Sequence, residues 1–171
     1  ERLPETRMIV VGAGDFSRYE RLMASFPDIV FRPNVPYADL PRYYRSATVF
    51  CCPNTGNESQ GYVLLEALAS ARAVVASNIE GFAGVMTDEV EGLLVRPKDS
   101  DAIAAAIERL LKDPHLRQVF GERGQALAQH YSWDNVARRV MSYYERILYE
   151  HQQVAESKAA RLPESAAAGG Q

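Results

Sequence analysis

Two glutamates, Glu58 and Glu66, flank the predicted start of a helix and carry the clearest chemical signal in the sequence. They follow an apolar run and a loop rich in Gly and Asn, and the helix begins near Gly61, which lets a ligand approach the backbone closely. At the carboxyl end of a parallel strand, backbone N–H groups of residues 60–63 and the helix dipole favour a diphosphate. Glu66 can accept hydrogen bonds from two ribose hydroxyls, and Glu58 from sugar hydroxyls. The pattern therefore predicts a site for a nucleoside diphosphate joined to a sugar.

Less specific interpretations stay open at this point. Glu58 also fits a solvated loop acid, and Glu66 a surface helix residue, as holds for most pairs of glutamates. The loop Gly12-Ala13-Gly14 begins like a dinucleotide-binding fingerprint, but Ser17 stands where that pattern has Gly or Ala, and no acid follows at the expected strand end. A nicotinamide-dependent oxidoreductase is therefore the less favoured interpretation.

Short apolar runs alternate with amphipathic segments over the first hundred residues. The runs are Met8–Val11, Ile29–Phe31, Thr48–Cys52, Ala73–Ala76 and Gly92–Val95. Continuous runs, rather than strict alternation, predict strands that are covered on both faces. Helices are predicted between them at 16–26, at 40–47 after an Asp39 cap, and at 61–70. The predicted fold class is α/β, a Rossmann-like parallel sheet flanked by helices.

Only helices are predicted from Ser100 onward. Ser100 is expected to cap the first, Asp113 followed by Pro114 starts the second, and Ser132 caps the third. The third helix is expected to bury one apolar side, made of Val136, Val140, Tyr143, Tyr144 and Ile147. Beyond Glu150 the sequence is rich in Ala, Ser, Gly and Gln, so we expect a domain over 1–150 and a disordered tail over 151–171.

Composition narrows the class of protein. With 171 residues, 47% apolar and 24% charged, the sequence is typical of one globular domain. A net charge of -3 argues against a broad nucleic-acid-binding face, and no apolar run is long enough to cross a membrane. The two cysteines, Cys51 and Cys52, are neighbours that form no disulfide framework, so core packing in a reducing, cytoplasmic setting is expected.

The segment 58–69 resembles the E-x7-E signature of group 1 (family 4) retaining glycosyltransferases, which have the GT-B fold of two Rossmann-like domains. Across residues 8–148, the loop 11–14, the strands 73–77 and 91–95, the stretch 131–134 and Tyr144 are similar to further features of that family. Residues 51–59 most resemble its phosphatidylinositol mannosyltransferase branch. This chain looks like the C-terminal, donor-binding domain.

The resemblance implies a role for each matching residue. Glu66 would hold the donor ribose, and Glu58, the candidate catalytic residue, would position the transferred sugar. The remaining donor-binding candidates are Ser59, Gln60, Gly61, Tyr62 and Val63, and the loops of Gly12, Gly14, Val35 and Pro36 would lie near the base. The implied reaction transfers a hexose, of mannosyl type, from a GDP- or UDP-sugar to a lipid or glycan with retention of configuration. No metal or cofactor is implied.

Some positions depart from the family pattern. Ala71 replaces a common Gly, Gln60 replaces a Phe, and Glu80 and Gly84 change the loop that follows. If Ala71 adopts a left-handed conformation, it costs roughly 1 kcal/mol relative to Gly.

The family's N-terminal domain, with the acceptor site, is not in this sequence, nor are the strand and helix expected before Met8. The missing strand is central in the order 3-2-1-4-5-6, so its loss is expected to open the middle of the sheet. Either a larger chain has been cut, or the remaining strands close up, or another polypeptide supplies the missing piece. The chain alone is expected to be catalytically incomplete, and to reach the inner face of the membrane through the missing domain. The alternative is a non-catalytic nucleotide-binding module, or a truncated fragment that needs another chain.

Overall fold

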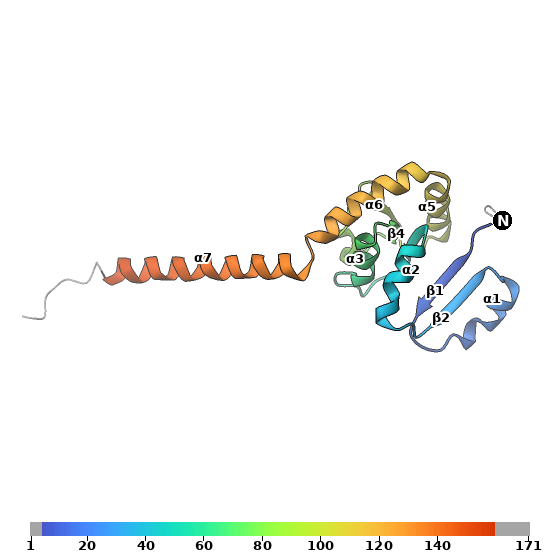
Figure 1. The fold of residues 1–171 in the computed structure, drawn as a ribbon, viewed down its shortest axis with the longest axis horizontal. Helices are drawn as coiled ribbons and strands as arrows, with labels where there is room; N and C mark the ends of the chain where they lie inside the picture. Colours follow the sequence, from blue (N-terminus) through green and yellow to red (C-terminus); the bar gives the residue numbers. More distant parts are fainter. Residues whose placement is uncertain (1–4, 160–171) are drawn as a thin grey trace, which may run out of the picture. The chain divides into compact units, whose positions relative to one another are not determined.

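The computed structural model describes residues 5–159 and contains all five predicted strands (Figure 1). Their bounds are β1 Met8–Gly12, β2 Ile29–Pro33, β3 Val49–Cys52, β4 Ala73–Ser77 and β5 Gly92–Val95. Every strand pair is parallel. The predicted α/β class is therefore confirmed, because parallel neighbours need the helical crossovers that the sequence places between them.

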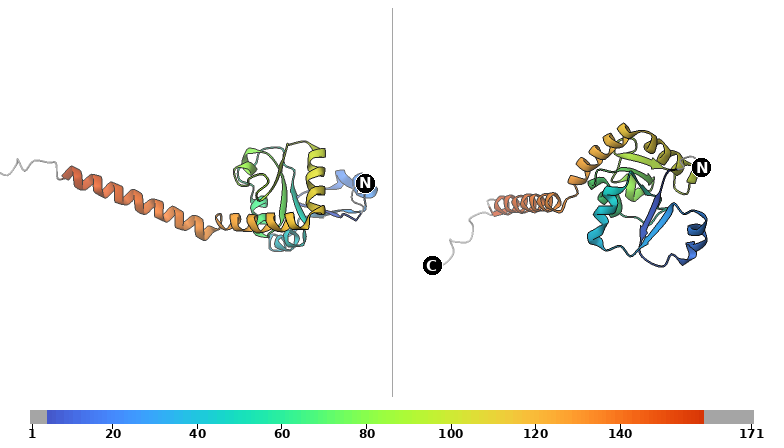
Figure 2. Two further views of the ribbon diagram at one scale, coloured as in Figure 1. Left: turned by 90° about the horizontal axis from the view of Figure 1, so that it is seen from above. Right: turned by 45° about the vertical axis from the view of Figure 1, so that its right-hand side comes forward.

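The strands form two separate sheets among the described residues. One has the order β1-β2, with Met8 opposite Ile29, and the other has the order β3-β4-β5, with Val49 opposite Ala73. The expected opening of the sheet is thus confirmed, and the alternative in which the remaining strands close up is wrong. Figure 2 shows the two blue strands of the smaller sheet from two further directions.

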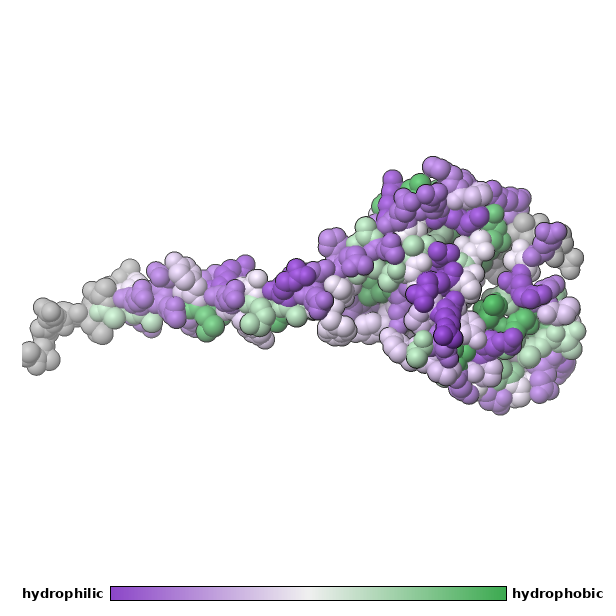
Figure 3. Space-filling view, viewed as in Figure 1, coloured by the Kyte–Doolittle hydropathy of each residue, from purple (hydrophilic) through white to green (hydrophobic). Residues whose placement is uncertain are grey.

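The opening leaves apolar residues of β1 in solvent. Met8 is 53% exposed, Ile9 49% and Val11 37%, although a continuous apolar run predicts cover on both faces. A hydrophobic patch interrupts the hydrophilic surface around β1 and β2 (Figure 3). One edge of β1 and one edge of β3 have no partner strand in the part of the chain that the structure describes.

The helices of the first unit are close to those predicted. Their bounds are η1 Ser17–Tyr19, α1 Glu20–Ser25, η2 Tyr37–Asp39, α2 Leu40–Ser46, α3 Tyr62–Ala69, α4 Glu80–Ala83, α5 Ser100–Lys112 and α6 Pro114–Gln129. The helix predicted at 16–26 is a single 3-10 turn followed by a short α-helix, and α4 was not predicted.

Asp39 stands at the predicted N-cap position of α2, but its side chain makes no capping hydrogen bond and instead forms an ion pair with Arg42, at 3.3 Å. The predicted cap at Ser100 is wrong. Asp99, not Ser100, caps α5, because its Oδ1 accepts a hydrogen bond from the Ala102 N–H at 2.9 Å. The cap at Asp113 is confirmed, since its Oδ1 accepts from the Leu116 N–H at 2.8 Å.

The core lies around β4, all five residues of which are buried among α3, α5 and α6 (Figure 1). On one face, Ala73 and Val75 pack with Leu93 of β5 and with three helical residues, Ala106, Leu110 and Phe120. Two glycines of α6 allow close packing, because a Cβ at Gly124 would overlap the Leu68 side chain and one at Gly121 the Ala71 carbonyl. This packing fixes the position of α3, which carries Glu66 and begins a few residues after Glu58.

The second compact unit begins at His130 and consists of α7, Trp133–Ala159. The predicted cap is present, with the Asn135 N–H donating to Ser132 Oγ at 3.4 Å. The predicted burial of its apolar side is wrong: α7 has no buried residue, and Val140, Tyr143 and Tyr144 are exposed. A single helix has no second layer to cover its apolar stripe.

The predicted tail is also corrected in part. Residues 151–159 belong to α7 and are helical, not disordered, and the rest of the tail lies outside the described residues. Within 5–159, no helix is both long and apolar enough to span a bilayer.

Ala71 has a φ of 54°, in the left-handed region, so the condition for a steric cost at this position is met. We expect Ala71→Gly to raise the free energy of unfolding by about 0.5–1 kcal/mol, because glycine adopts this backbone without a steric penalty. Thermal melting measures the change. Ala105→Gly is the matched control: Ala105 is exposed within α5, and glycine there should lower stability by about 1 kcal/mol. A lower melting temperature for both variants would contradict the strain at Ala71.

Candidate functional site

The start of α3 depends on Gly61. Its φ of 67° is left-handed, and a Cβ at this position would lie 2.6 Å from the ring of Phe82, which is fully buried. Only glycine satisfies both constraints. The chain therefore turns sharply into α3, and the N–H groups of Tyr62 and Val63 have no acceptor within the helix. Such a helix start favours an anion.

Glu58 lies immediately before this turn. Its Oε1 accepts a hydrogen bond from the Gly61 N–H at 3.1 Å, so in this structure its carboxylate occupies the anion-favouring end of α3. Its backbone contacts α4, since a Cβ at Gly81 would overlap the Glu58 carbonyl. Glycine at 81 thus sets the distance between the loop and α4.

A shallow hollow lies where these two segments meet, beyond the carboxyl ends of β3 and β4. It is lined by Gly56, Asn57, Glu58, Ser59, Ile79 and Glu80. Glu58 and Ser59 were among the predicted site residues, whereas Glu80 was not. The rule that ligands bind at the carboxyl edge of parallel strands identifies Glu80 as well, since it closely follows β4.

Glu66 lies one turn into α3, half-buried, and is held by two tyrosines. The Tyr44 hydroxyl donates to Glu66 Oε2 at 2.6 Å, and the Tyr37 hydroxyl donates to Oε1 at 3.2 Å. Sequence reasoning missed both tyrosines, which are 22 and 29 positions away along the chain. The carboxylate of Glu66 therefore has a defined orientation before any ligand arrives.

The glycine loop and the loop after β2 are joined through Asn34. The Gly14 N–H donates to Asn34 Oδ1 at 3.3 Å, and the Asn34 N–H donates to the Gly12 carbonyl at 2.8 Å. Val35 and Pro36 follow Asn34 and lead directly into Tyr37, which reaches Glu66. The structure thus links the loops predicted to lie near a base to the residue predicted to hold a ribose.

This edge of the molecule offers an open helix start, a fixed carboxylate and a second carboxylate at the hollow. Open N–H groups suit phosphate oxygens, and carboxylates suit the hydroxyls of a sugar. In the described part of the chain, His, Cys, Asp and Glu side chains form no cluster of three that could hold a metal ion.

Residues 1–113 match the family described as glycosyl transferases, group 1. The chain belongs to this family. It is 34% identical over 166 residues to the phosphatidyl-myo-inositol mannosyltransferase of Mycolicibacterium smegmatis, covering 96% of this chain and 43% of that protein. It is 36% identical over 121 residues to the D-inositol 3-phosphate glycosyltransferase of Salinispora tropica, covering 71% of this chain and 25% of that one. The predicted likeness to the mannosyltransferase branch is confirmed.

Solved structures agree on the fold. Sucrose-phosphate synthase from Thermosynechococcus elongatus superposes with a TM-score of 0.76 at 28% identity, over 87% of this chain and 40% of that one. The C-terminal domain of a group 1 glycosyltransferase from Francisella tularensis superposes with a TM-score of 0.63 at 25% identity, over 74% of this chain and 69% of that one. The neighbours are GT-B glycosyltransferases, which confirms the predicted fold. The chain spans 43% of the mannosyltransferase from Mycolicibacterium smegmatis.

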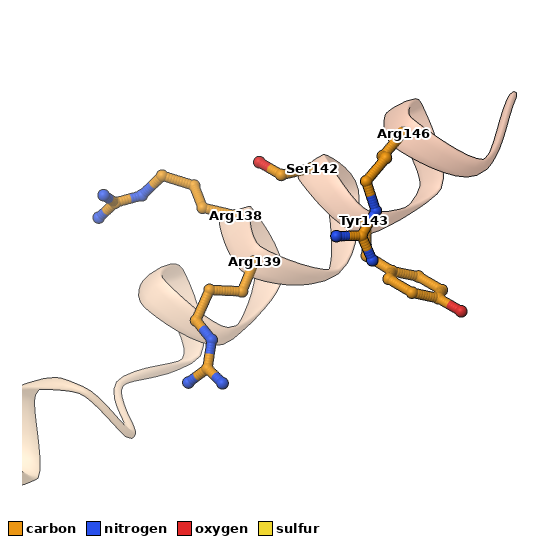
Figure 4. Close-up of a pocket in the computed structure, with 5 residues that line it drawn as sticks. All are labelled: Arg138, Arg139, Ser142, Tyr143 and Arg146. Atoms are coloured by element: carbon orange, nitrogen blue, oxygen red, sulfur yellow. The ribbon is translucent and has the colours of Figure 1, made fainter. Parts of the chain in front are cut away.

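A second shallow hollow lies on α7. Its lining residues, Arg138, Arg139, Ser142, Tyr143 and Arg146, all come from this one helix. Figure 4 shows the side chains of Arg138 and Arg139 pointing in different directions, while the guanidinium of Arg146 lies 5.3 Å from the centre of the Tyr143 ring. Side chains that diverge from one helix do not enclose a ligand.

The two cysteines have the packing role that the sequence predicts. Burial raises the pKa of Cys51 to about 11, and burial with nearby acidic groups raises the pKa of Cys52 to about 12. At pH 8 very little of the Cys51 thiol is then thiolate, the reactive form. We expect iodoacetamide to modify neither thiol in the folded chain and both in guanidinium chloride, as measured by mass spectrometry. Rapid modification of the folded chain would show that these thiols are accessible.

Gly81→Ala tests whether the close contact with Glu58 shapes the site. The added methyl meets backbone that cannot rotate away, so we expect a loss of about 1–3 kcal/mol in the free energy of unfolding, measured by urea denaturation. Gly84→Ala is the control. Gly84 has a φ of -73°, and a Cβ there meets only the Glu80 carbonyl, at 3.3 Å. Equal losses in both variants would argue against a special role for the contact at Gly81.

Proposed function

We propose that this chain is the donor-binding part of a glycosyltransferase that transfers a hexose from a nucleoside diphosphate sugar with retention of configuration. The observation that carries the proposal is the Glu66 carboxylate, which two tyrosines hold at the carboxyl edge of the strands. A carboxylate with fixed orientation suits the two neighbouring hydroxyls of a ribose, because it accepts one hydrogen bond on each oxygen.

The diphosphate of the donor binds at the start of α3. The N–H groups of Tyr62 and Val63 and the positive end of the helix dipole compensate its charge. Glu58 now bonds the Gly61 N–H, and two anions repel one another at so short a range. The arriving diphosphate therefore displaces the Glu58 carboxylate, which turns toward the sugar in the hollow shared with Glu80.

Transfer requires the diphosphate to leave while the sugar gains oxocarbenium character. The preorganised N–H groups at α3 stabilise the negative charge that develops on the leaving group, and this kind of stabilisation is commonly a large part of catalysis. Glu58 and Ser59 hold the sugar on the opposite side of that bond. The acceptor and its binding site come from the part of the protein outside this chain.

The names of the relatives support the choice of sugar and acceptor. Several are phosphatidyl-myo-inositol mannosyltransferases, so we propose a mannosyl donor and an inositol-containing lipid acceptor at a membrane surface. The Anabaena protein HepE, solved in complex with UDP, has this fold at 22% identity and a TM-score of 0.66, over 92% of this chain and 42% of that one.

One observation favours the alternative of a nucleotide-binding module without catalysis: the sheet stays open between β1 and β3. The two proposals differ in a measurable way. Mannosyl transfer that appears when the N-terminal domain of a related mannosyltransferase is added in trans would support the enzyme. Nucleotide binding without transfer under those conditions would support the module.

Thermal-shift titration with UDP, GDP, ADP and NAD tests the donor site directly. A nucleoside diphosphate at 100 times its dissociation constant should stabilise the fold by about 2.7 kcal/mol, which corresponds to roughly 5–10 °C. Glu66→Gln should abolish most of that shift, because an amide oxygen and an NH2 group cannot accept from both ribose hydroxyls. Glu122→Gln, on the exposed side of α6, is the control and should keep the full shift. A shift with NAD that ignores Glu66 would overturn the proposal.

A further inference from the structure

The two tyrosines that hold Glu66 differ sharply in their surroundings. Tyr44 is 9% exposed and lies on α2, whereas Tyr37 is 78% exposed and lies on the 3-10 turn that precedes it. The bond from Tyr44 measures 2.6 Å and the bond from Tyr37 measures 3.2 Å. One carboxylate oxygen is thus held tightly from inside the protein, and the other is covered loosely from the solvent side.

Tyr44 is rigid because its ring is packed. Its centroid lies 5.3 Å from that of Phe50 of β3, with the planes tilted by 60°. Burial, and then the nearby carboxylate of Glu66, raise the pKa of Tyr44 above its ordinary value, so its hydroxyl stays a proton donor at any physiological pH. A short hydrogen bond to a carboxylate from a fixed ring sets the rotation of that carboxylate.

Tyr37 has no comparable support. The negative charge of Glu66 raises its pKa, so it too remains protonated and donates. Its ring, however, lies largely in water, and the bond it makes is longer than is usual for a hydroxyl donor. Such a bond exchanges readily with a competing hydroxyl, since breaking it leaves no buried group without a partner.

We propose that Tyr44 is the positioning residue for Glu66, and that the Tyr37 hydroxyl occupies the place on Glu66 Oε1 that a ribose hydroxyl of the donor takes over. This inference rests on the proposed function, because it assumes that Glu66 binds a ribose. A vicinal diol brings two hydroxyl donors to one carboxylate, one for each oxygen. Each oxygen has two lone pairs, so Oε2 accepts from the buried Tyr44 and from one ribose hydroxyl together. The exposed Tyr37 stands on the solvent side of Oε1, where the other ribose hydroxyl arrives, and it is displaced to the side of the nucleoside, next to the loop of Val35 and Pro36.

The two roles predict opposite effects for the same chemical change. Tyr37→Phe removes a competitor for Oε1 and should tighten UDP or GDP binding by about two- to fivefold. Tyr44→Phe lets the carboxylate rotate and should weaken binding by about tenfold. Tyr43→Phe, at the neighbouring position on α2, is the matched control and should change neither value. Isothermal titration calorimetry on the 171-residue chain measures all three.

A comparison of UDP and GDP with their 2′-deoxy forms separates positioning from mere support of the fold. The native chain should favour the ribose form, and Tyr44→Phe should reduce that preference, because the misplaced carboxylate no longer meets both hydroxyls. A purely structural role for Tyr44 would lower the melting temperature and leave the preference unchanged, which would overturn its role as a positioning residue.

The remaining outcomes distinguish this inference from the function on which it rests. In one outcome, the native chain binds a nucleoside diphosphate and Glu66→Gln abolishes that binding, but Tyr37→Phe weakens it or has no effect. The displacement of Tyr37 is then wrong, and the donor site stands. If the native chain binds none of these nucleotides, or if Glu66→Gln binds as the native chain does, the proposed function fails and this inference fails with it.

Discussion

The sharp turn at Gly61 is the constraint on which the site depends. A left-handed residue packed against the buried ring of Phe82 directs the chain from the loop into α3 within one position. This turn leaves the first N–H groups of the helix open and places Glu58 on one side of them. Glu66 follows one turn later on the same helix. The two glutamates lie on either side of the open N–H groups because the helix starts at a fixed point between them.

Packing in the surrounding core fixes the position of that turn. Glycines of α6 let it pack closely on α3 and on the strained residue Ala71, while Gly81 brings α4 against the backbone of Glu58. Each contact removes freedom from an element that carries a site residue. The polar groups are in turn preorganised: Tyr44 orients Glu66, and Asn34 joins the loops after β1 and β2. A ligand at the candidate site would therefore not have to order these groups.

The smaller sheet lacks such support. β1 has apolar residues that point to both faces, yet Met8 and Ile9 are about half exposed, and one edge has no partner strand among the described residues. An apolar strand with an open edge is a surface that pairs readily with another strand. The apolar stripe of α7 is uncovered within its own unit for a related reason, since burial of a stripe requires a second layer.

The sequence by itself determined the strands, the start of α3 and the cap at Asp113, because apolar runs, glycines, caps and prolines act over a few neighbouring residues. It also identified the family through the two glutamates. Only the tertiary structure decided that Tyr37 and Tyr44 hold Glu66, that Glu80 joins Glu58 at one hollow, and that the sheet is split. These features depend on contacts between positions 22 or more apart, which no local pattern encodes. The exposure of α7 belongs with them, because burial depends on what packs against a face as well as on the apolar residues it carries.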